Sequence, residues 1–439
     1  MNFFWELKHG NSDNRIIEGS KAVCYSELES LVCAAQQKLP ESKQLVALVA
    51  HNSLAFVIYY LALLRNRHAI LLLDANKSMA ENQAIAEHFQ ANLFIDKETV
   101  TGLHARNLEI ADALALLLPT SGSTGSVKRV KLTFENLAEN TLGISQTLPI
   151  SAGDKAMTSL PLSYSFGLSI LNTHLQVGAE IILGQESVFA KDFWQQFKQH
   201  SVNSFYGVPF SFEMLVKLGL TRLPLEQLKY MAQAGGRLSN ELWHALQQFS
   251  KTRGVAFFPM YGQTEATARI AIMQSSEFLQ APPGTIGEPL PQCQLYIEDD
   301  AEQGELCFSG ANIFCGYANA TVDLQTCSSI ALLKTGDIAK RLTTGQLQII
   351  GRTKRIAKLE GRRLNLDELE SEVEKNLNLP CVITSDDDIL KVITCHRFSE
   401  GSDKRIAALA GCHFRQIKLI KVEEIPRLSN GKVDYHGLD

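Results

Sequence analysis

The sequence lacks the features of a secreted or membrane-spanning protein. Its nine cysteines form no C-x-x-C pair, and thiols scattered through a long chain are typical of a reducing compartment, not of a disulfide framework. The first residues show no basic region followed by an apolar stretch, so no signal peptide is expected. The longest apolar run, 54–64, ends at Arg65 and is too short to cross a bilayer. These absences predict a cytoplasmic protein without a membrane span.

An excess of positive charge is also missing. The chain carries 42 Lys and Arg against 47 Asp and Glu, a net charge of −5, which argues against nucleic acid as the main partner. Hydrophobic residues make up 45% of the chain, enough for a well-packed core. At 439 residues the chain exceeds a single ordinary core, so we expect two domains or one large domain with subdomains.

Strand-like and helical segments alternate through most of the chain. The run 45–50 is apolar throughout, as in a strand buried on both faces. A helix over 53–65 and a strand over 69–73 complete a βαβ unit. Such alternation predicts an α/β fold with mainly parallel sheets flanked by helices. Further strands are expected near residues 93, 113, 180, 204, 229 and 255.

The pattern of expected strands and helices changes in the last third of the chain. From Gly304 short strands and turns predominate, and 366–377 reads as an amphipathic helix with Asn365 as its N-cap. Segments 381–384 and 389–395 flank an acidic turn, like a hairpin. We therefore expect a boundary near 351–354. It would separate a large multi-subdomain N-terminal domain, residues 1–351, from a small mobile α+β domain, residues 352–439.

One loop, Thr120–Lys128, is rich in glycine and hydroxyl side chains and follows the apolar run 113–118. Glycines let the backbone approach an anion closely, and the N–H groups, hydroxyls and Lys128 offer donors to phosphate. A flexible Ser/Gly turn is the simpler reading of such composition. The loop is not a Walker loop, because Val127 replaces the second glycine and no Ser or Thr follows Lys128. It predicts a phosphate loop of another kind, left by a helix over 136–142.

Further stretches have nucleotide-binding chemistry. Glycines in 234–237 would let a flat ring lie on the backbone, and 261–265 offers an aromatic face, a hydroxyl and a carboxylate. Asp337 supplies a carboxylate of the kind that chelates ribose hydroxyls. A basic connector spans 351–358, and the turn 429–432 presents a lysine. Taken singly, each has a simpler explanation: a packed tyrosine, a surface turn or a solvated basic face. Their order with the loop indicates a nucleotide site.

Together these segments resemble the adenylate-forming superfamily of acyl- and aryl-CoA synthetases, peptide-synthetase adenylation domains and luciferases. Residues 120–128 are similar to its phosphate loop T-S-G-[ST]-T-G-x-P-K-G, 261–265 to Y-G-x-T-E and 335–337 to T-G-D. The resemblance covers essentially the whole chain. It extends to the acyl-pocket segment 161–168, G-E-L-x-x-x-G at 304–310, G-Y at 316–317, the hinge segment 351–370 and P-x-x-x-x-G-K at 426–432.

The chain departs from the family pattern at a few positions. Val127 stands in place of the usual proline, and Arg129 in place of the usual glycine. Tyr164 occupies the position where many members have a histidine that gates the acyl pocket. The chain is also shorter than most relatives. These changes affect the expected shape of the acyl site and leave the groups that the chemistry needs in place.

The resemblance implies two half-reactions. A carboxylate would first attack the α-phosphate of MgATP, giving an acyl-adenylate and pyrophosphate. The small domain would then rotate about Lys354, withdraw Lys432 and bring the Gly361 region to a channel for the thiol. The implied cofactors are ATP and Mg²⁺, with CoA or phosphopantetheine as acyl acceptor. The implied partners are a small carboxylic acid and CoA or an acyl or peptidyl carrier protein.

The resemblance also implies roles for individual residues. Lys432, Thr264 and Glu265 would be catalytic, with Glu265 binding Mg²⁺. Lys432 would bridge the carboxylate and the α-phosphate. The acyl pocket would contain Tyr164, Ser165, Phe166 and Gly167. The nucleotide would be bound by Thr120, Ser121, Gly122, Ser123, Thr124, Gly125, Lys128, Gly235, Gly236, Arg237, Tyr261, Gly262, Gln263, Thr264, Asp337, Arg352 and Lys432.

The acyl group is predicted from the pocket segment. Residues 163–167 contain no acid to pair with an α-ammonium group, which favours a fatty, aryl or other non-amino acid. The alternative is that another carboxylate fills this role in a stand-alone amino-acid adenylation enzyme that loads a carrier protein. Other readings are a non-catalytic nucleotide or acyl sensor, an unrelated P-loop NTPase and a luciferase-type oxygenase, for which no oxygen-handling site is apparent.

Overall fold

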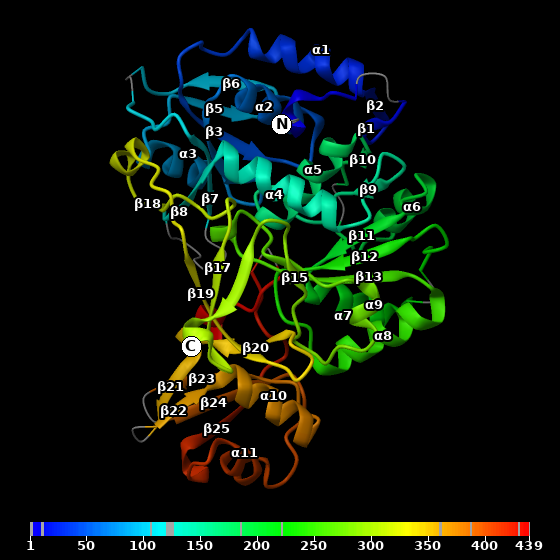
Figure 1. Ribbon diagram of the computed structural model, residues 1–439, viewed down its shortest axis with the longest axis vertical. Helices are drawn as coiled ribbons and strands as arrows, with labels where there is room; N and C mark the ends of the chain where they lie inside the picture. Colours follow the sequence, from blue (N-terminus) through cyan, green and yellow to red (C-terminus); the bar gives the residue numbers. More distant parts are fainter. Residues whose placement is uncertain are drawn as a thin grey trace.

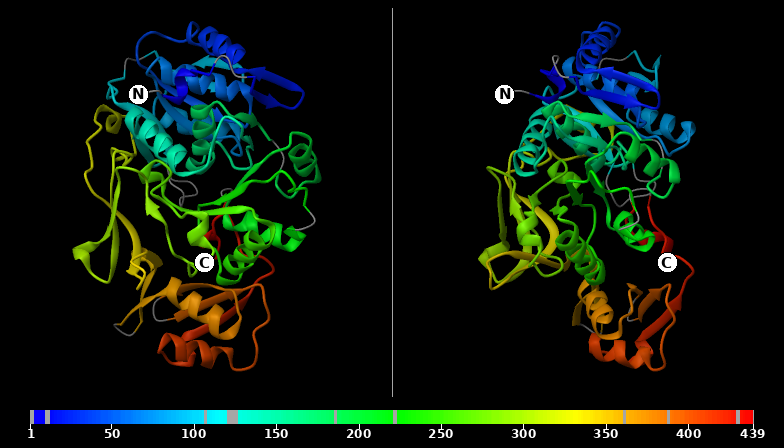
Figure 2. Two further views of the ribbon diagram at one scale, coloured as in Figure 1. Left: turned by 45° about the vertical axis from the view of Figure 1, so that its right-hand side comes forward. Right: turned by 90° about the vertical axis from the view of Figure 1, so that its right-hand side faces the viewer.

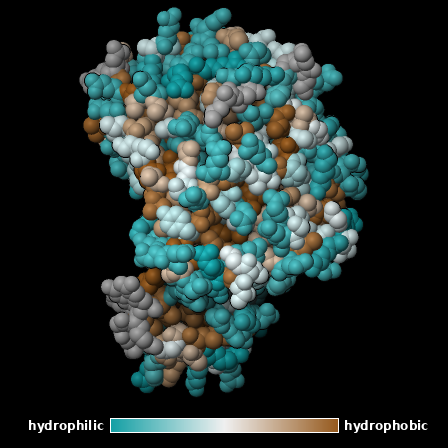
Figure 3. All heavy atoms as spheres, viewed as in Figure 1, coloured by the Kyte–Doolittle hydropathy of each residue, from teal (hydrophilic) through white to brown (hydrophobic). Residues whose placement is uncertain are grey.

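Two large β-sheets, a smaller antiparallel sheet and a C-terminal part make up the computed structural model (Figure 1). It describes residues 3–9, 13–105, 108–119, 127–184, 187–220, 223–359, 362–386, 389–428 and 431–438. The expected α/β class is confirmed. Among these residues no helix is long and apolar enough to cross a membrane, and hydrophilic side chains cover most of the face drawn in Figure 3.

The apolar runs near the N-terminus form a seven-stranded sheet in the order β18-β8-β7-β4-β3-β5-β6. Its inner strands β3, β4, β5 and β7 pair in parallel, and its edges are antiparallel. The strands are β3 (Leu45–Ala50), β4 (Ala69–Asp74), β5 (Leu93–Asp96), β6 (Thr99–Gly102), β7 (Leu114–Pro119), β8 (Arg129–Thr133) and β18 (Tyr317–Ala318). Every residue of β3 is buried, as a strand covered on both faces requires.

The second sheet has nine strands in the order β15-β14-β13-β12-β11-β9-β10-β1-β2. Its central pairings are parallel, and the edge pairs β1–β2, β13–β14 and β14–β15 are antiparallel. The strands are β1 (Arg15–Glu18), β2 (Lys21–Cys24), β9 (Lys155–Met157), β10 (Glu180–Ile182), β11 (Ser204–Gly207), β12 (Tyr230–Gln233), β13 (Ala256–Tyr261), β14 (Ala271–Ile272) and β15 (Glu288–Pro289).

Helices α4 (Phe134–Thr147) and α5 (Ser165–Val177) lie between the two sheets (Figure 1). Leu137 and Leu168 pack with the seven-stranded sheet, whereas Ile144 and Phe166 pack with the nine-stranded one. A helix covered on both sides is expected to be buried all round, and residues 165–175 of α5 are all buried. The outer helices are α1 (Tyr25–Gln36), α2 (Leu54–Arg65), α3 (Met79–His88), α6 (Lys191–Gln199), α7 (Pro209–Leu218), α8 (Asn240–Arg253) and α9 (Ser275–Phe278).

An antiparallel sheet, β16-β17-β19-β20, leads to the C-terminal part. Its strands are β16 (Gln294–Ile297), β17 (Gln303–Ser309), β19 (Leu333–Arg341) and β20 (Leu347–Arg352). The C-terminal part has its own apolar core, drawn from residues between 357 and 419. Its elements are β21 (Ile356–Leu359), β22 (Arg362–Asn365), α10 (Leu366–Leu377), β23 (Val382–Asp386), β24 (Ile389–Thr394), α11 (Ser402–Ala410) and β25 (Ile417–Lys421).

Local predictions in this region and near the predicted phosphate loop are confirmed. Asn365 accepts hydrogen bonds from the N–H groups of Asp367 and Glu368 at the start of α10, and β23 and β24 form the expected antiparallel hairpin. The helix expected over 136–142 lies within α4, although a strand that was not expected separates it from the loop. Strand β8 intervenes and pairs antiparallel with β7, because its buried side chains add another strand to the sheet before α4 begins.

Candidate functional site

The predicted phosphate loop connects the ends of β7 and β8. Thr120, Ser121, Gly122, Ser123, Thr124 and Gly125 lie outside the described residues. The pairing of Pro119 with Arg129 brings both ends of the loop together. Lys128, at the loop's end, has its Nζ 3.5 Å from the centre of the Tyr317 ring, a cation–π contact.

Tyr317 links this lysine to a carboxylate. Its hydroxyl donates a hydrogen bond of 2.9 Å to Oε1 of Glu265, and burial together with Glu265 raises the pKa of Tyr317. The backbone N–H of Phe314 donates to the Glu265 carbonyl at 2.8 Å. The structure therefore brings the predicted phosphate lysine and the predicted metal carboxylate into one chain of contacts. Sequence reasoning gave Tyr317 no role in the site.

Asp337 is the centre of a second group of contacts. Antiparallel pairing of β19 with β20 sets Asp337 opposite Arg352, whose Nε lies 3.0 Å from Oδ1 of Asp337. The hydroxyl of Tyr261, at the end of β13, donates to Oδ2 at 2.5 Å. Asp337 raises the pKa of Arg352, and burial followed by Asp337 raises the pKa of Tyr261. The strand pairing and the Tyr261 hydrogen bond thus join three residues that the sequence assigns to the nucleotide.

Lys432 approaches the same groups from the C-terminal end of the chain. Burial first, and then the nearby charge of Arg352, lower its pKa to about 8, while Asp337 and Glu265 act in the opposite direction. The Lys432 ammonium therefore lies within electrostatic range of both the Asp337 and the Glu265 carboxylates.

A tight turn holds this lysine in place. The N–H of Gly431 donates to the Leu428 carbonyl, and the N–H of Leu428 donates to the Lys432 carbonyl, each at 2.8 Å. Gly431 has φ 80°, and a Cβ there would lie 2.7 Å from Cγ2 of Val208. Only glycine suits both the left-handed backbone and this close approach. Figure 2 shows the C-terminal end, in red, rising from the C-terminal part to the main body.

The predicted adenine segment follows β12. Gly235 has φ +87°, and a Cβ there would come within 2.7 Å of the Tyr164 hydroxyl, so the turn and the acyl segment touch. Burial raises the pKa of Tyr164 to about 12. Arg237 lies against Gly284 instead, and among the described residues no hydrogen bond or ion pair joins it to Tyr261 or Asp337.

The acyl segment begins helix α5. The Ser165 hydroxyl lies 3.4 Å from Oγ1 of Thr264, and both side chains are buried. Nε2 of the neighbouring Gln263 is buried and has no hydrogen-bond partner among the described residues. Thr264 and Ser165 therefore join the predicted α-phosphate site to the predicted acyl pocket.

Sequence reasoning missed Arg269, which lies beside this segment. Its guanidinium carbon is 4.5 Å from the centre of the Phe166 ring, and Nη2 donates to the Ser169 hydroxyl at 3.2 Å. Arg269 is only 2% exposed. The sign in the sequence was a single charge within the otherwise uncharged run 266–273.

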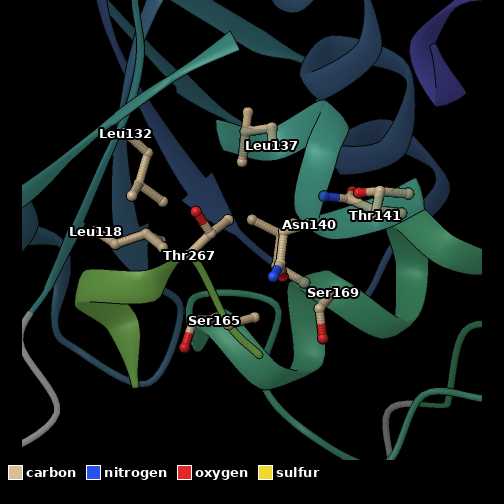
Figure 4. Close-up of a pocket in the computed structure, with 11 residues that line it drawn as sticks. Leu118, Leu132, Leu137, Asn140, Thr141, Ser165, Ser169 and Thr267 are labelled. Carbon is tan, nitrogen blue, oxygen red and sulfur yellow. The ribbon is translucent and has the colours of Figure 1, made fainter. Parts of the chain in front are cut away.

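A cavity of about 10 Å³ lies behind the acyl segment, between α4 and α5. Figure 4 shows Asn140, Ser165, Ser169 and Thr267 around it. This volume suits about one water molecule. The cavity is therefore too small to hold a nucleotide or an acyl group.

The predicted hinge lies in a short helical turn, Thr353–Arg355, between β20 and β21. Lys354 is exposed there. Arg355 forms ion pairs with Asp367, at 2.7 Å, and with Glu370, which tie the turn to α10. Gly361, the predicted thiol-channel residue, lies outside the described residues.

The chain matches a known family and is similar to known proteins over most of its length. The model of a family described as "AMP-binding enzyme" matches residues 8–318. The chain is 26% identical to tyrocidine synthase 3 of Brevibacillus parabrevis over 96% of its length, but spans only 7% of that protein. It is 25% identical to oxalate–CoA ligase of Arabidopsis thaliana, covering 81% of this chain and 79% of the relative.

Solved structures share the fold at low sequence identity. O-succinylbenzoate coenzyme A synthetase of Bacillus subtilis in complex with AMP superposes with a TM-score of 0.79 and 20% identity, covering 100% of this chain and 98% of that one. ATP-bound MatB from Rhodopseudomonas palustris gives a TM-score of 0.80 at 20% identity, with the same coverage of both chains.

Proposed function

Because the chain belongs to the AMP-binding enzyme family, we propose that it uses ATP to activate a carboxylic acid as an acyl-adenylate. The acyl group would then pass to the thiol of CoA or of a carrier-protein phosphopantetheine, with release of AMP and pyrophosphate. The observation that carries this proposal is the convergence of Lys432, Asp337, Glu265 and Arg352, which come from distant parts of the chain. Such a set of cations and carboxylates suits a substrate with both phosphates and ribose hydroxyls.

The nucleotide would be held from several sides. Lys128, together with the loop 120–125, would bind the β- and γ-phosphates. Asp337 and Arg352 would bind the ribose, and the Tyr261 ring and Gly235–Arg237 would bind adenine. Thr264 would donate to the α-phosphate. Phosphoryl transfer needs in-line positioning and charge stabilisation from the protein, and these groups would supply both.

The Glu265 carboxylate fits the magnesium that such chemistry uses. The Tyr317 hydroxyl orients it, and a carboxylate oxygen is the ligand that Mg²⁺ prefers. Among the described residues, no group of three or more His, Cys, Asp or Glu is arranged so that it could hold a metal ion. When bound, Mg²⁺ would neutralise phosphate charge.

Lys432 would act at the reacting atoms in the first half-reaction. A carboxylate attacking an α-phosphate brings two anions together, and a preorganised ammonium lowers the energy of the charge that develops between them. The turn 428–432 and its contact with Val208 hold the ammonium near Glu265 and Asp337.

The second half-reaction would need a different arrangement. We propose that residues 352–439 form a small domain, which turns about Lys354 relative to residues 1–351 and withdraws Lys432. The separate apolar core of the C-terminal part supports this division. The Gly361 region would then face the entering thiol.

The nine free cysteines favour a reducing compartment, and so a cytoplasmic location.

A non-amino carboxylic acid suits the acyl segment best. Residues 163–167 contain no acid, and the neighbouring Arg269 would repel an α-ammonium group. ATP–pyrophosphate exchange with a panel of acids tests the proposal. We expect exchange with aryl, fatty or other non-amino acids, followed by thioester formation with CoA or a phosphopantetheinylated carrier protein. Exchange with amino acids alone would contradict the acyl assignment, and exchange with no acid would contradict the proposed activity.

A further inference from the structure

Arg269 is a buried cation without a counter-charge in the described part of the chain. Its side chain is 2% exposed, and none of the described carboxylates forms an ion pair with it. The groups that act on its charge are the phenols of Tyr164 and Tyr206. Burial lowers its pKa to about 10, so the guanidinium remains charged at neutral pH.

The backbone around Arg269 is held rigidly. Its carbonyl accepts hydrogen bonds from the side-chain amides of Asn140, at 2.8 Å, and Asn312, at 2.9 Å. These amides come from α4 and from the loop after β17, and both are buried. These two hydrogen bonds fix the position of the Arg269 backbone, from which its side chain extends into the interior.

One donor of the guanidinium has no acceptor among the described residues. Nη2 donates to Ser169 and Nη1 to the Ala268 carbonyl, each at 3.2 Å. Nε is buried and has no hydrogen-bond partner among the described residues. An arginine offers five N–H donors in a planar fork that matches a carboxylate. Burying such a charge without an anion is unfavourable, and binding an anion offsets that cost.

The position of Arg269 relates it to the reacting end of the substrate. Thr264 contacts Ser165 in the first turn of α5, and Arg269 contacts Ser169 one turn later. Four residues along a helix correspond to about 6 Å. The hydroxyls that contact Thr264 and Arg269 thus lie one turn apart on one face of α5, a spacing close to the length of a short acyl chain.

We propose that Arg269 binds a second anionic group of the substrate, so that the acid this enzyme activates is a short dicarboxylic acid. The inference rests on the proposed function and adds the substrate class. The first carboxylate would react at the α-phosphate, and the distal carboxylate would lie against the Arg269 guanidinium. A fatty acid would leave the guanidinium buried and unpaired, and the enzyme would therefore discriminate against it.

Matched pairs of acids test this proposal on the unmodified protein. Pyrophosphate exchange is measured with succinate and butyrate, glutarate and valerate, adipate and hexanoate, and isophthalate and benzoate. We expect the dicarboxylate of at least one pair to have a kcat/KM about 100-fold higher or more, because a site built around a buried charge strongly rejects an analogue that leaves it unpaired. Higher activity with the monocarboxylate in every pair would overturn the inference and leave the proposed function intact.

Variants of Arg269 distinguish a role in binding the dicarboxylate from a role in folding. Arg269→Gln should lower kcat/KM for the preferred dicarboxylate about 100-fold or more and remove the preference within its pair, while Arg269→Lys should restore part of it. Because Arg269→Gln removes an unpaired buried charge, its melting temperature should equal or exceed that of the wild type. If Arg269→Gln lowered kcat/KM equally for the dicarboxylate and the monocarboxylate of a pair, the inference would be overturned. A protein that binds no ATP and exchanges with no acid would contradict the proposed function, and the inference with it.

Discussion

Arg427 and Glu213 form an ion pair at 3.3 Å, although 214 positions separate them in the chain. Glu213 is on α7, and the Arg427 guanidinium also lies 4.8 Å from the centre of the Phe210 ring on the same helix. Nη1 of Arg427 donates to the Gly431 carbonyl at 3.1 Å. These contacts fasten the turn that carries Lys432 to the main body.

Weakening this ion pair should loosen the turn. The pair is partly exposed, and such pairs contribute up to about 1 kcal/mol. Glu213→Gln should therefore slow pyrophosphate exchange by no more than about fivefold, with ATP affinity little changed. Lys217→Gln, on the same helix, serves as a matched control and should have no effect. Equal rates for both variants would show that the ion pair does not help to position Lys432.

Removing the Lys432 ammonium should have a far larger effect. Loss of a preorganised donor to developing charge typically costs about 100- to 1,000-fold in rate. We expect Lys432→Ala to lose pyrophosphate exchange to that extent and to retain ATP binding and melting temperature. Supplied with presynthesised acyl-adenylate, the variant should still form thioester. Lys421→Ala, at the exposed end of β25, is the control, and normal exchange by Lys432→Ala would falsify the assignment.

The lowered pKa of Lys432 predicts a pH dependence. A lysine is charged below its pKa, and that of Lys432 is about 8. The ammonium is therefore lost as pH rises through about 8, and kcat/KM for exchange, which reports the free enzyme, should fall there. Lys432→Arg keeps its charge and should shift this decline to higher pH. A wild-type profile that stays flat through this range would contradict the prediction.

A proline at the hinge should separate the two half-reactions. Proline fixes φ and removes a backbone donor, so Lys354→Pro should restrict the turn between β20 and β21. We expect near-normal pyrophosphate exchange and impaired thioester formation. Lys354→Ala, which leaves the backbone free, should impair neither step. Equal loss of both steps by Lys354→Pro, with a lowered melting temperature, would indicate misfolding instead of a blocked rotation.

Local patterns in the sequence were sufficient for much of the fold. The apolar run 45–50, the helix 366–377 and its cap Asn365 appear as expected, because strand burial, helical periodicity and capping act over a few neighbouring residues. The short motifs and their order along the chain also indicated the family, since each motif spans only a few neighbouring residues.

Tertiary structure decided how those units meet. The placing of Asp337 against Arg352 depends on strand pairing, and that of Lys432 near Glu265 on a turn docked against α7. The helix expected over 136–142 formed within α4, but strand β8 before it was not expected, because its place depends on pairing with β7. The sequence marked Arg269 only as a lone charge in an uncharged run, because its burial and the absence of a nearby carboxylate among the described residues are properties of packing. Contacts between residues far apart in the chain leave no periodic trace, so only the folded structure could reveal them.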